Sequence, residues 1–161
     1  MEAGQAAPAG TNRITVEVNG TRYERDVEAR RLLIHLIRDD LDLTGSHVGC
    51  DTGNCGACSV ILDRTLVKSC MVLAIQADVA SIETVEGLAG EEQLTPLQQA
   101  FSDHHALQCG YCTPGMLMSA TALLRTKPHP SEDEIRTAIQ GNICRCTGYV
   151  NIVEAIKAVG G

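Results

Sequence analysis

The chain has 161 residues, of which 44% are apolar and only 2% aromatic, with one Phe, three Tyr and no Trp. Thirteen basic and twenty acidic residues give a formal net charge of −7. This composition is that of a folded globule of one domain or two very small ones, and it excludes a disordered chain. No apolar run approaches the roughly 18 residues of a membrane span, so none is expected. The acidic balance argues against a nucleic-acid partner bound through its phosphates.

Eight cysteines are the most unusual feature of the composition. The first ten residues lack the basic and apolar regions of a signal peptide, so we expect a cytoplasmic protein whose residues 1–11 form a disordered tail. In a reducing compartment, clustered cysteines bind metal more often than they form disulfides; four disulfides are the alternative for a secreted chain. The two groups of four are Cys50, Cys55, Cys58 and Cys70, and Cys109, Cys112, Cys144 and Cys146. They predict two four-ligand sites.

The first half, residues 12–86, is predicted to be a β-rich domain, because its apolar residues alternate in short runs. Asn19-Gly20 is typical of a tight hairpin turn, and Asp63-Arg64 is expected to turn a second hairpin. Leucine and isoleucine at helical spacing predict one helix across the sheet. The predicted elements are strands 13–19, 21–27, 59–62, 65–70 and 81–85 and a helix at 31–40. Two hairpins packed on one helix predict a ubiquitin-like, β-grasp roll.

The glycine-rich segment from Gly45 to Cys58 carries the first three cysteines. It lacks the Lys-Ser/Thr ending of a phosphate-binding loop. The spacing Cys50-x4-Cys55-x2-Cys58, with Cys70 further on, is the plant-type ferredoxin spacing for a [2Fe-2S] cluster. A tetrahedral zinc site usually pairs two Cys-x2-Cys units, and only one is present here. The segment therefore predicts a [2Fe-2S] site.

The second half, residues 87–161, is predicted to be a bundle of four short helices, joined to the first half by a linker over 87–92. Thr113-Pro114 is read as an N-cap followed by a first-turn proline, and Ser131 and Glu134 as a capping box. The predicted helices are 95–105, 113–125, 131–141 and 151–159.

The second cysteine group lies on turns before two of these helices, where free N–H groups and the helix dipole stabilise thiolates. Its spacing is less specific than that of the first group, and zinc or a redox disulfide between Cys109 and Cys112 are alternatives to a cluster. His35 and His47 are expected to pack or face solvent rather than bind metal, and the remaining motifs carry no nucleophilic catalyst.

Three long motifs in register resemble the iron–sulfur subunit of the xanthine oxidase family of molybdenum hydroxylases. They are Gly49–Cys58, Gln108–Gly115 and Gly141–Tyr149. The resemblance covers about residues 12 to 159 and includes all eight cysteines. The finer pattern over Arg31–Arg38, Leu43–Thr52 and Val67–Cys70 is most similar to small subunits of aerobic carbon monoxide dehydrogenases.

The resemblance implies an electron-transfer subunit with two [2Fe-2S] clusters, one in a plant-type ferredoxin-like domain and one in a four-helix domain. It implies a large partner subunit with molybdopterin and a medium one with FAD, assembled as a dimer of heterotrimers. The second cysteine group would lie nearest the molybdopterin, contacted by Gln108 and Cys146, and the first group would relay electrons to FAD. Positions expected around the sulfurs are Gly49, Gly53, Gly56, Gly110 and Arg145.

Related small subunits serve aldehyde and N-heteroaromatic dehydrogenases, so the substrate stays open at this point. A stand-alone two-cluster electron carrier and a zinc-bearing interaction module are the rival functions.

Overall fold

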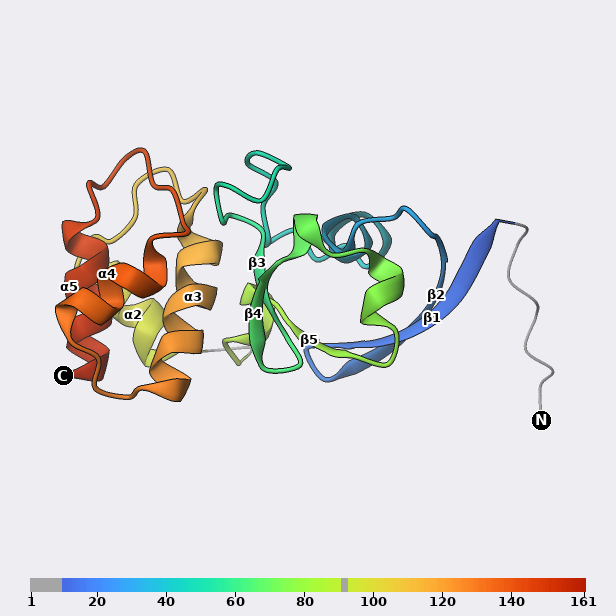
Figure 1. The fold of residues 1–161 in the computed structure, drawn as a ribbon. Coiled ribbons are helices and arrows are strands. Elements are labelled where there is room, and N and C mark those ends of the chain that lie inside the picture. The colour runs from blue at the N-terminus through green and yellow to red at the C-terminus, as the bar shows by residue number, and fades with distance from the viewer. Residues whose placement is uncertain (1–9, 91–92) are drawn as a thin grey trace.

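The computed structural model describes residues 10–90 and 93–161 (Figure 1). The predicted disordered tail falls almost wholly outside the described residues, and Thr11 already belongs to the first strand. A mixed sheet forms one half of the molecule and helices form the other, as the α+β prediction requires.

The two predicted hairpins are present. Strands β1 (Thr11–Val18) and β2 (Thr21–Glu28) pair antiparallel, as do β3 (Ser59–Leu62) and β4 (Thr65–Lys68). Both turns have two residues with positive φ, which is the backbone of a type I′ hairpin: Asn19 and Gly20 at 52° and 78°, and Asp63 and Arg64 at 44° and 72°.

Strand β5 (Ser81–Glu83) joins the hairpins into one sheet. It runs parallel to β1 and antiparallel to β3, which gives the order β2-β1-β5-β3-β4. The alternating residues Ile14, Val16 and Val18 of β1 are all buried, because they point to the covered face of the sheet. β5 is shorter than the predicted strand 81–85, since the chain turns into a 3-10 segment, η4 (Val85–Gly87).

The predicted helix over 31–40 begins later and is not a regular α-helix. Leu32 has extended backbone and bridges Leu73, so the helix begins only with α1 (Leu33–His35). It continues as a π-helical segment, η1 (Leu36–Asp40), in which the Leu41 amide bonds to the Leu36 carbonyl.

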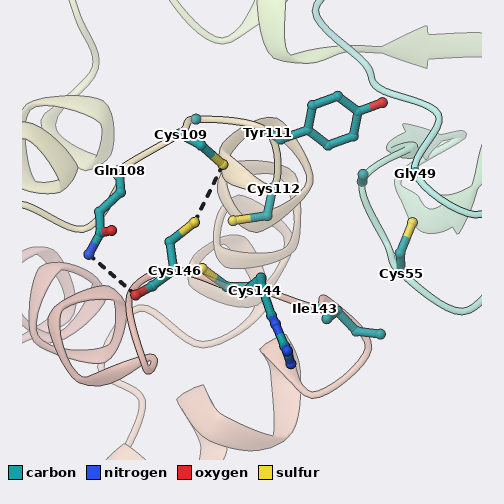
Figure 2. Close-up of a pocket in the computed structure, with 12 residues that line it drawn as sticks. Gly49, Cys55, Gln108, Cys109, Tyr111, Cys112, Ile143, Cys144 and Cys146 are labelled. Atoms are coloured by element: carbon teal, nitrogen blue, oxygen red, sulfur yellow. Dashed lines mark hydrogen bonds between the residues drawn. The ribbon is translucent and has the colours of Figure 1, made fainter.

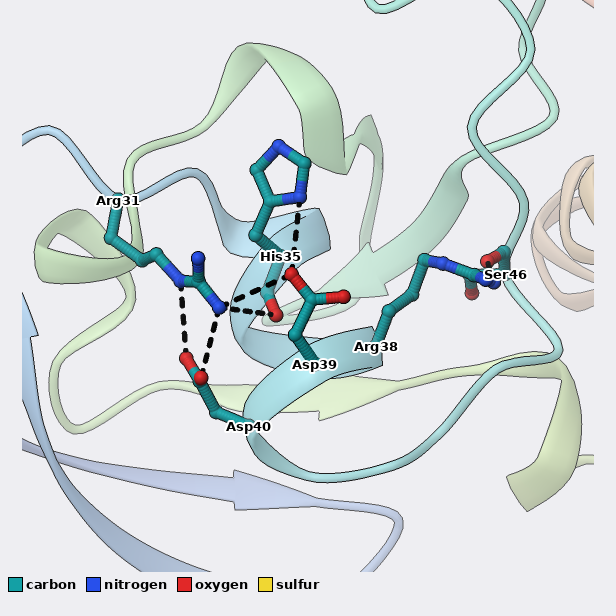
Figure 3. Close-up of polar contacts among 6 residues, drawn as sticks. All are labelled: Arg31, His35, Arg38, Asp39, Asp40 and Ser46. Atoms are coloured by element: carbon teal, nitrogen blue, oxygen red, sulfur yellow. Dashed lines mark hydrogen bonds and ion pairs between the residues drawn. The ribbon is translucent and has the colours of Figure 1, made fainter.

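Charged side chains on the outside of this helical segment form the contacts of Figure 3. Arg31 bonds to Asp39 and Asp40, but these ion pairs are solvent-exposed and add little to stability. Arg38 is different because its guanidinium donates to the carbonyls of Thr44 and Ser46, at 2.5 and 2.6 Å, and so holds the start of the glycine-rich loop.

The predicted strand 65–70 ends two residues early. After Lys68 the chain forms a 3-10 turn, η2 (Ser69–Met71), because the Ser69 amide and hydroxyl both bond to the Cys58 carbonyl. A second 3-10 segment, η3 (Ala74–Ala77), then leads to β5. Cys70 therefore sits in a turn rather than at a strand end.

Four helices follow in the described part of the second half, close to the predicted ranges. They are α2 (Pro96–Asp103), α3 (Thr113–Thr126), α4 (Glu132–Ile139) and α5 (Val150–Gly160). The capping box of Ser131 and Glu134 is confirmed. Residues 91–92 of the predicted linker lie outside the described residues, and Gly87 belongs to η4.

His104 lies at the exposed end of α2. One detail of these helices differs from the prediction. Thr113 is the first residue of α3 rather than its N-cap, because the turn at Gly110 runs directly into the helix and the Cys112 carbonyl accepts the first helical bond from Met116.

The sheet and the helices have separate hydrophobic cores that meet along α3. α3 packs against β3 and β4, as Figure 1 shows, and Arg125 near its end makes two hydrogen bonds of 2.6 and 2.7 Å to Glu83 of β5. The closest approach is at Gly115, where a Cβ atom would lie 2.2 Å from the Gly56 carbonyl oxygen. No side chain fits there, so two backbones meet directly.

We expect Gly115→Ala to lower the free energy of unfolding by about 1–3 kcal/mol, because the added methyl forces α3 away from the Gly56 loop. Chemical denaturation measures this change. Gly90→Ala is the matched control, since a Cβ there would meet no described atom within 4 Å. Equal effects of the two substitutions would contradict the close backbone contact.

Candidate metal centres

The first sulfur set (Cys50, Cys55, Cys58 and Cys70) is assembled by the loop before β3 and by turn η2. Cys58 and Cys70 are buried and pack on Ile34 of α1. Cys50 and Cys55 are only half-buried. The set therefore has an inner pair against the core and an outer pair nearer solvent.

Backbone amides of the loop point at the outer pair. The amides of Thr52 and Cys55 donate to the Cys50 sulfur, at 3.4 and 3.3 Å. Hydrogen bonds from Thr52, and then from Cys55, lower the pKa of Cys50 to about 6. Burial, followed by the neighbouring thiol of Cys58, raises the pKa of Cys70 to about 11. The loop thus favours a thiolate at its rim and disfavours an isolated charge at its base.

The three glycines predicted to lie around the sulfurs of the first set have different neighbours. A Cβ at Gly49 would lie 2.9 Å from the Cys55 sulfur, so Gly49 makes room beside the sulfur set. Gly53 has a φ of 73° and packs against Met71, while its carbonyl accepts a 2.6 Å bond from Lys68. Gly56 faces the second domain, because a Cβ there would lie 2.5 Å from the Gly141 carbonyl.

The second sulfur set (Cys109, Cys112, Cys144 and Cys146) lies where the loop before α3 meets the loop between α4 and α5. Figure 2 shows the four side chains directed toward one another. Cys112 and Cys144 are half-buried against the helical core, whereas Cys109 and Cys146 are exposed, with their sulfurs 3.6 Å apart. The second set repeats the inner and outer pairs of the first.

Tyr149 supports the turn that carries Cys144. Its hydroxyl accepts a bond from the Cys144 amide at 2.9 Å and donates to the Asn142 carbonyl at 3.2 Å. Tyr149 itself has left-handed backbone, with a φ of 71°, where the loop enters α5. The Thr147 amide donates to the Cys144 sulfur at 3.4 Å. These contacts fix the position of one inner thiol of the second set.

The inner thiols of the second set have opposite shifts. Burial, and then the nearby Cys144, raises the pKa of Cys112 to about 12. Burial also acts to raise the pKa of Cys144, but the hydrogen bonds from Thr147 outweigh it and lower the pKa. Burial and hydrogen bonding therefore act in opposite directions on the two inner thiols of the second set.

Gln108 and Arg145 lie at the outer rim of the second set. The Gln108 side chain donates to the Cys146 carbonyl at 3.3 Å (Figure 2), so the two residues that the family resemblance assigns to the pterin are in contact. Arg145 is exposed between Cys144 and Cys146, and Gly110 has a φ of 80° in the turn between Cys109 and Cys112. These residues line one side of a pocket of about 220 Å³ whose other side is formed by Gly49, Cys55 and Ala57.

The donor sets fit [2Fe-2S] clusters. All eight cysteines are free thiols, and in each set they lie in two pairs. Among residues 10–90 and 93–161, no three His, Cys, Asp or Glu side chains converge on the position of a single ion. A [2Fe-2S] cluster has no need of such a trio, because each of its irons takes two protein thiolates. The amides aimed at Cys50 and Cys144 supply the hydrogen bonds that cluster sulfurs accept.

Several residues that shape the sites were not singled out from the sequence. Tyr149, Lys68 and Asn142 act through backbone atoms of other residues, and cysteine spacing carries no trace of such bonds. The sequence does contain one indication that tyrosines contribute to the sites. Two of the three in the chain, Tyr111 and Tyr149, stand inside cysteine motifs.

Two family models match the chain. The "2Fe-2S iron-sulfur cluster binding domain" matches residues 16–93, and the "[2Fe-2S] binding domain" matches residues 84–157. The chain therefore contains two [2Fe-2S]-binding domains, one around each sulfur set.

Similar proteins are small subunits of bacterial dehydrogenases. The nicotine 6-hydroxylase small subunit of Paenarthrobacter nicotinovorans is 51% identical, over 93% of this chain and 90% of the relative. The caffeine dehydrogenase subunit gamma of Pseudomonas sp. (strain CBB1) is 52% identical, over 91% and 89%. In the crystal structure of quinoline 2-oxidoreductase from Pseudomonas putida 86, one chain superposes with a TM-score of 0.92 at 45% identity, over 94% of both chains.

The fold, the two sulfur sets and these relatives define an iron–sulfur electron-transfer protein. The chain belongs to the family of small iron–sulfur subunits of xanthine oxidase-type molybdenum hydroxylases, which are oxidoreductase complexes. Within the described residues, no helix has the length and apolar character needed to cross a membrane.

We expect Tyr149→Phe to destabilise the loop before α5 by about 1–3 kcal/mol, because the Cys144 amide and the Asn142 carbonyl both lose a partner. The absorbance of the second cluster should then bleach faster in denaturant than that of the first. Tyr23→Phe on β2 is the control, since Tyr23 lies far from both sulfur sets in the sheet. Identical bleaching in the two variants would contradict this role of Tyr149.

Proposed function

We propose that the first sulfur set ligates one [2Fe-2S] cluster and the second sulfur set another. The observation that carries this proposal is the repeated arrangement of an inner and an outer cysteine pair in each matched domain. When bound, the clusters accept and release one electron at a time. The chain's own residues hold the thiolates, donate hydrogen bonds to sulfur and keep the inner pairs away from water.

We also propose the finer architecture that these sites require. Residues 12–86 form a β-grasp, plant-type ferredoxin-like domain, supported by the strand order and by α1 packed on one face of the sheet. Residues 87–161 form the four-helix domain, supported by its separate core. Iron–sulfur ligands must stay reduced, which favours the cytoplasm as the place of work.

The partner chains are proposed from the exposed rim of the second set. Cys109, Cys146 and Gln108 are exposed there, and they are surrounded by exposed apolar side chains. These side chains are Leu107, Tyr111, Ile143 and Val150. A rim of this composition suits a large protein partner. We propose that it faces a molybdopterin-bearing large subunit, that the first set faces an FAD-bearing medium subunit, and that the assembly is a dimer of heterotrimers.

Metal analysis tests the ligand assignment. We expect about four irons and four acid-labile sulfides per chain, and two paramagnetic signals on reduction. Cys58→Ala should remove one signal and Cys112→Ala the other, each with loss of about half of the iron. Removal of all iron should unfold both loops, because each cluster cross-links its domain. One zinc and two irons per chain would contradict the assignment of the second set.

An N-heteroaromatic compound is the proposed substrate class of the complex. Small subunits about half identical to this chain serve enzymes named for nicotine and caffeine, and the quinoline enzyme has a closely superposable chain. The similarity to carbon monoxide dehydrogenases stays a prediction. The substrate is chosen on the large subunit, so this proposal depends on relatives rather than on a pocket of this chain.

Purification of the complete complex tests the partners and the substrate together. We expect molybdenum and flavin to copurify with this chain, and dye reduction with quinoline or nicotine to exceed that with carbon monoxide. Denatured complex controls for non-enzymatic reduction of the dye. Activity with carbon monoxide alone would reject the N-heteroaromatic class, and a chain that purifies without either cofactor would reject the partner proposal.

A further inference from the structure

The loops that carry the two sulfur sets touch through His47 and Tyr111. Tyr111 lies between Cys109 and Cys112, and His47 lies three residues before Cys50. Figure 2 shows the Tyr111 side chain extending out of its own loop toward the segment that contains Gly49. The contact therefore joins two domains at the positions where each holds its sulfurs.

The contact is specific in its geometry. The two rings are stacked, with centroids 4.5 Å apart and planes 22° from parallel. His47 Nδ1 lies 2.8 Å from the Tyr111 carbonyl, and since a carbonyl only accepts, Nδ1 carries the hydrogen and donates. The Tyr111 hydroxyl donates to the Val48 carbonyl at 2.7 Å. We name this group of His47, Val48 and Tyr111 the His47–Tyr111 clamp.

The first-domain side of the clamp is anchored from behind. The His47 amide donates to the Ala57 carbonyl at 3.2 Å, which ties the clamp to the segment between Cys55 and Cys58. The carbonyl of Ser46 is held by Arg38 of the π-helical segment (Figure 3). His47 is thus fixed to its own domain and presents its ring to the other.

A further backbone bond lies beside the clamp. The Ile143 amide, next to Cys144, donates to the Cys55 carbonyl at 2.8 Å. This bond joins a cysteine of the first set to the neighbour of a cysteine of the second set. Any shift between the two loops must stretch this bond. The protection of the Ile143 amide against hydrogen exchange therefore reports on the clamp.

The domains do not depend on the clamp to stay together. Arg125 and Glu83 pair at the far end of α3, and Asn142 donates to the Gly56 carbonyl at 3.0 Å while accepting a bond from buried Ser119. Removal of the clamp should therefore loosen the Cys109–Cys112 segment against His47 and Val48 while the domain interface remains. The clamp therefore affects the relative position of the sulfur loops rather than the association of the two domains.

We propose that the His47–Tyr111 clamp is a positioning device that fixes the distance and the orientation between the two sulfur sets, and hence between the clusters they hold. The inference rests on the ligand sets proposed above. Electron transfer between two centres falls steeply as their separation grows, and both loops lack regular secondary structure of their own. A stacked ring pair with two hydrogen bonds supplies the stiffness that the loop backbones lack.

Three variants in the complete, cluster-loaded complex separate the parts of the clamp. His47→Phe keeps a ring but loses the donor to the Tyr111 carbonyl. His47→Asn keeps a donor close to the position of Nδ1 but loses the ring. Tyr111→Phe keeps the ring and loses only the hydroxyl. His104→Phe and His104→Asn are the matched controls, because His104 is an exposed histidine at the end of α2.

Two readouts follow the clamp, and neither is activity. The first is the splitting that the reduced clusters impose on each other's paramagnetic signals, which depends on their separation and orientation. We expect this splitting to broaden in His47→Phe and Tyr111→Phe, because the separation and orientation of the clusters become less uniform. In His47→Asn the splitting should recover at least partly. The iron and sulfide content should be unchanged in all three variants. The second is hydrogen exchange of the Ile143 amide, which should speed up by about two- to tenfold on loss of one hydrogen bond.

Unchanged splitting together with unchanged exchange at Ile143 in both His47→Phe and Tyr111→Phe would overturn the proposal, as would equal changes in the His104 controls. The exchange measurement does not depend on the clusters. A wild-type complex without two paramagnetic signals would therefore reject the ligand sets, while accelerated exchange in the variants would still identify the clamp.

Discussion

The direct contact between the Gly56 carbonyl and Gly115 is the constraint on which the rest of the structure depends. α3 can reach β3 only because Gly115 carries no side chain. This approach brings the loop of the first sulfur set against the loops of the second, where Asn142 bonds to the same Gly56 carbonyl. Neither domain alone could bring two sulfur sets onto neighbouring loops, so the glycine contact is a functional feature as well as a packing feature.

Each sulfur set balances burial against hydrogen bonding. Burial raises the pKa of Cys70 and of Cys112, so these thiols would keep their protons until a bound metal centre displaced them. Amide donors lower the pKa of Cys50, and contacts from Thr147 lower that of Cys144. A buried thiolate would be costly without a counter-charge. The first set thus combines a buried thiol of raised pKa with an outer thiol of lowered pKa, whereas the opposing pKa shifts of Cys112 and Cys144 both fall on the inner pair of the second set.

Much of the fold was predictable from local patterns. Asn19-Gly20 specified its turn, the alternation of Ile14, Val16 and Val18 specified a strand with one buried face, and Ser131 with Glu134 specified the start of α4. The errors arose where a distant contact overrides the pattern. Leu32 is drawn into a bridge with Leu73, which shortens the helix after it.

In the candidate sites, too, some residues were predictable from the sequence and others were not. The grouping of the cysteines into four and four predicted both sulfur sets, while short spacing brings only neighbouring ligands together, such as Cys55 with Cys58 and Cys144 with Cys146. The support from Tyr149, Lys68 and Arg38 was not predictable, because those side chains bond to backbone carbonyls and amides, which every residue possesses. The resemblance to a known family added Gln108, whose contact with Cys146 agrees with a shared place at the rim.

The exposed outer pair of the second set has a consequence for the order of biogenesis. Cys109 and Cys146 are open to solvent in the isolated chain, and they lie on the face proposed to meet the large subunit. On that proposed arrangement, iron and sulfide would reach the second set only while the face is uncovered. Cluster insertion into this chain would then come before its docking to the large subunit.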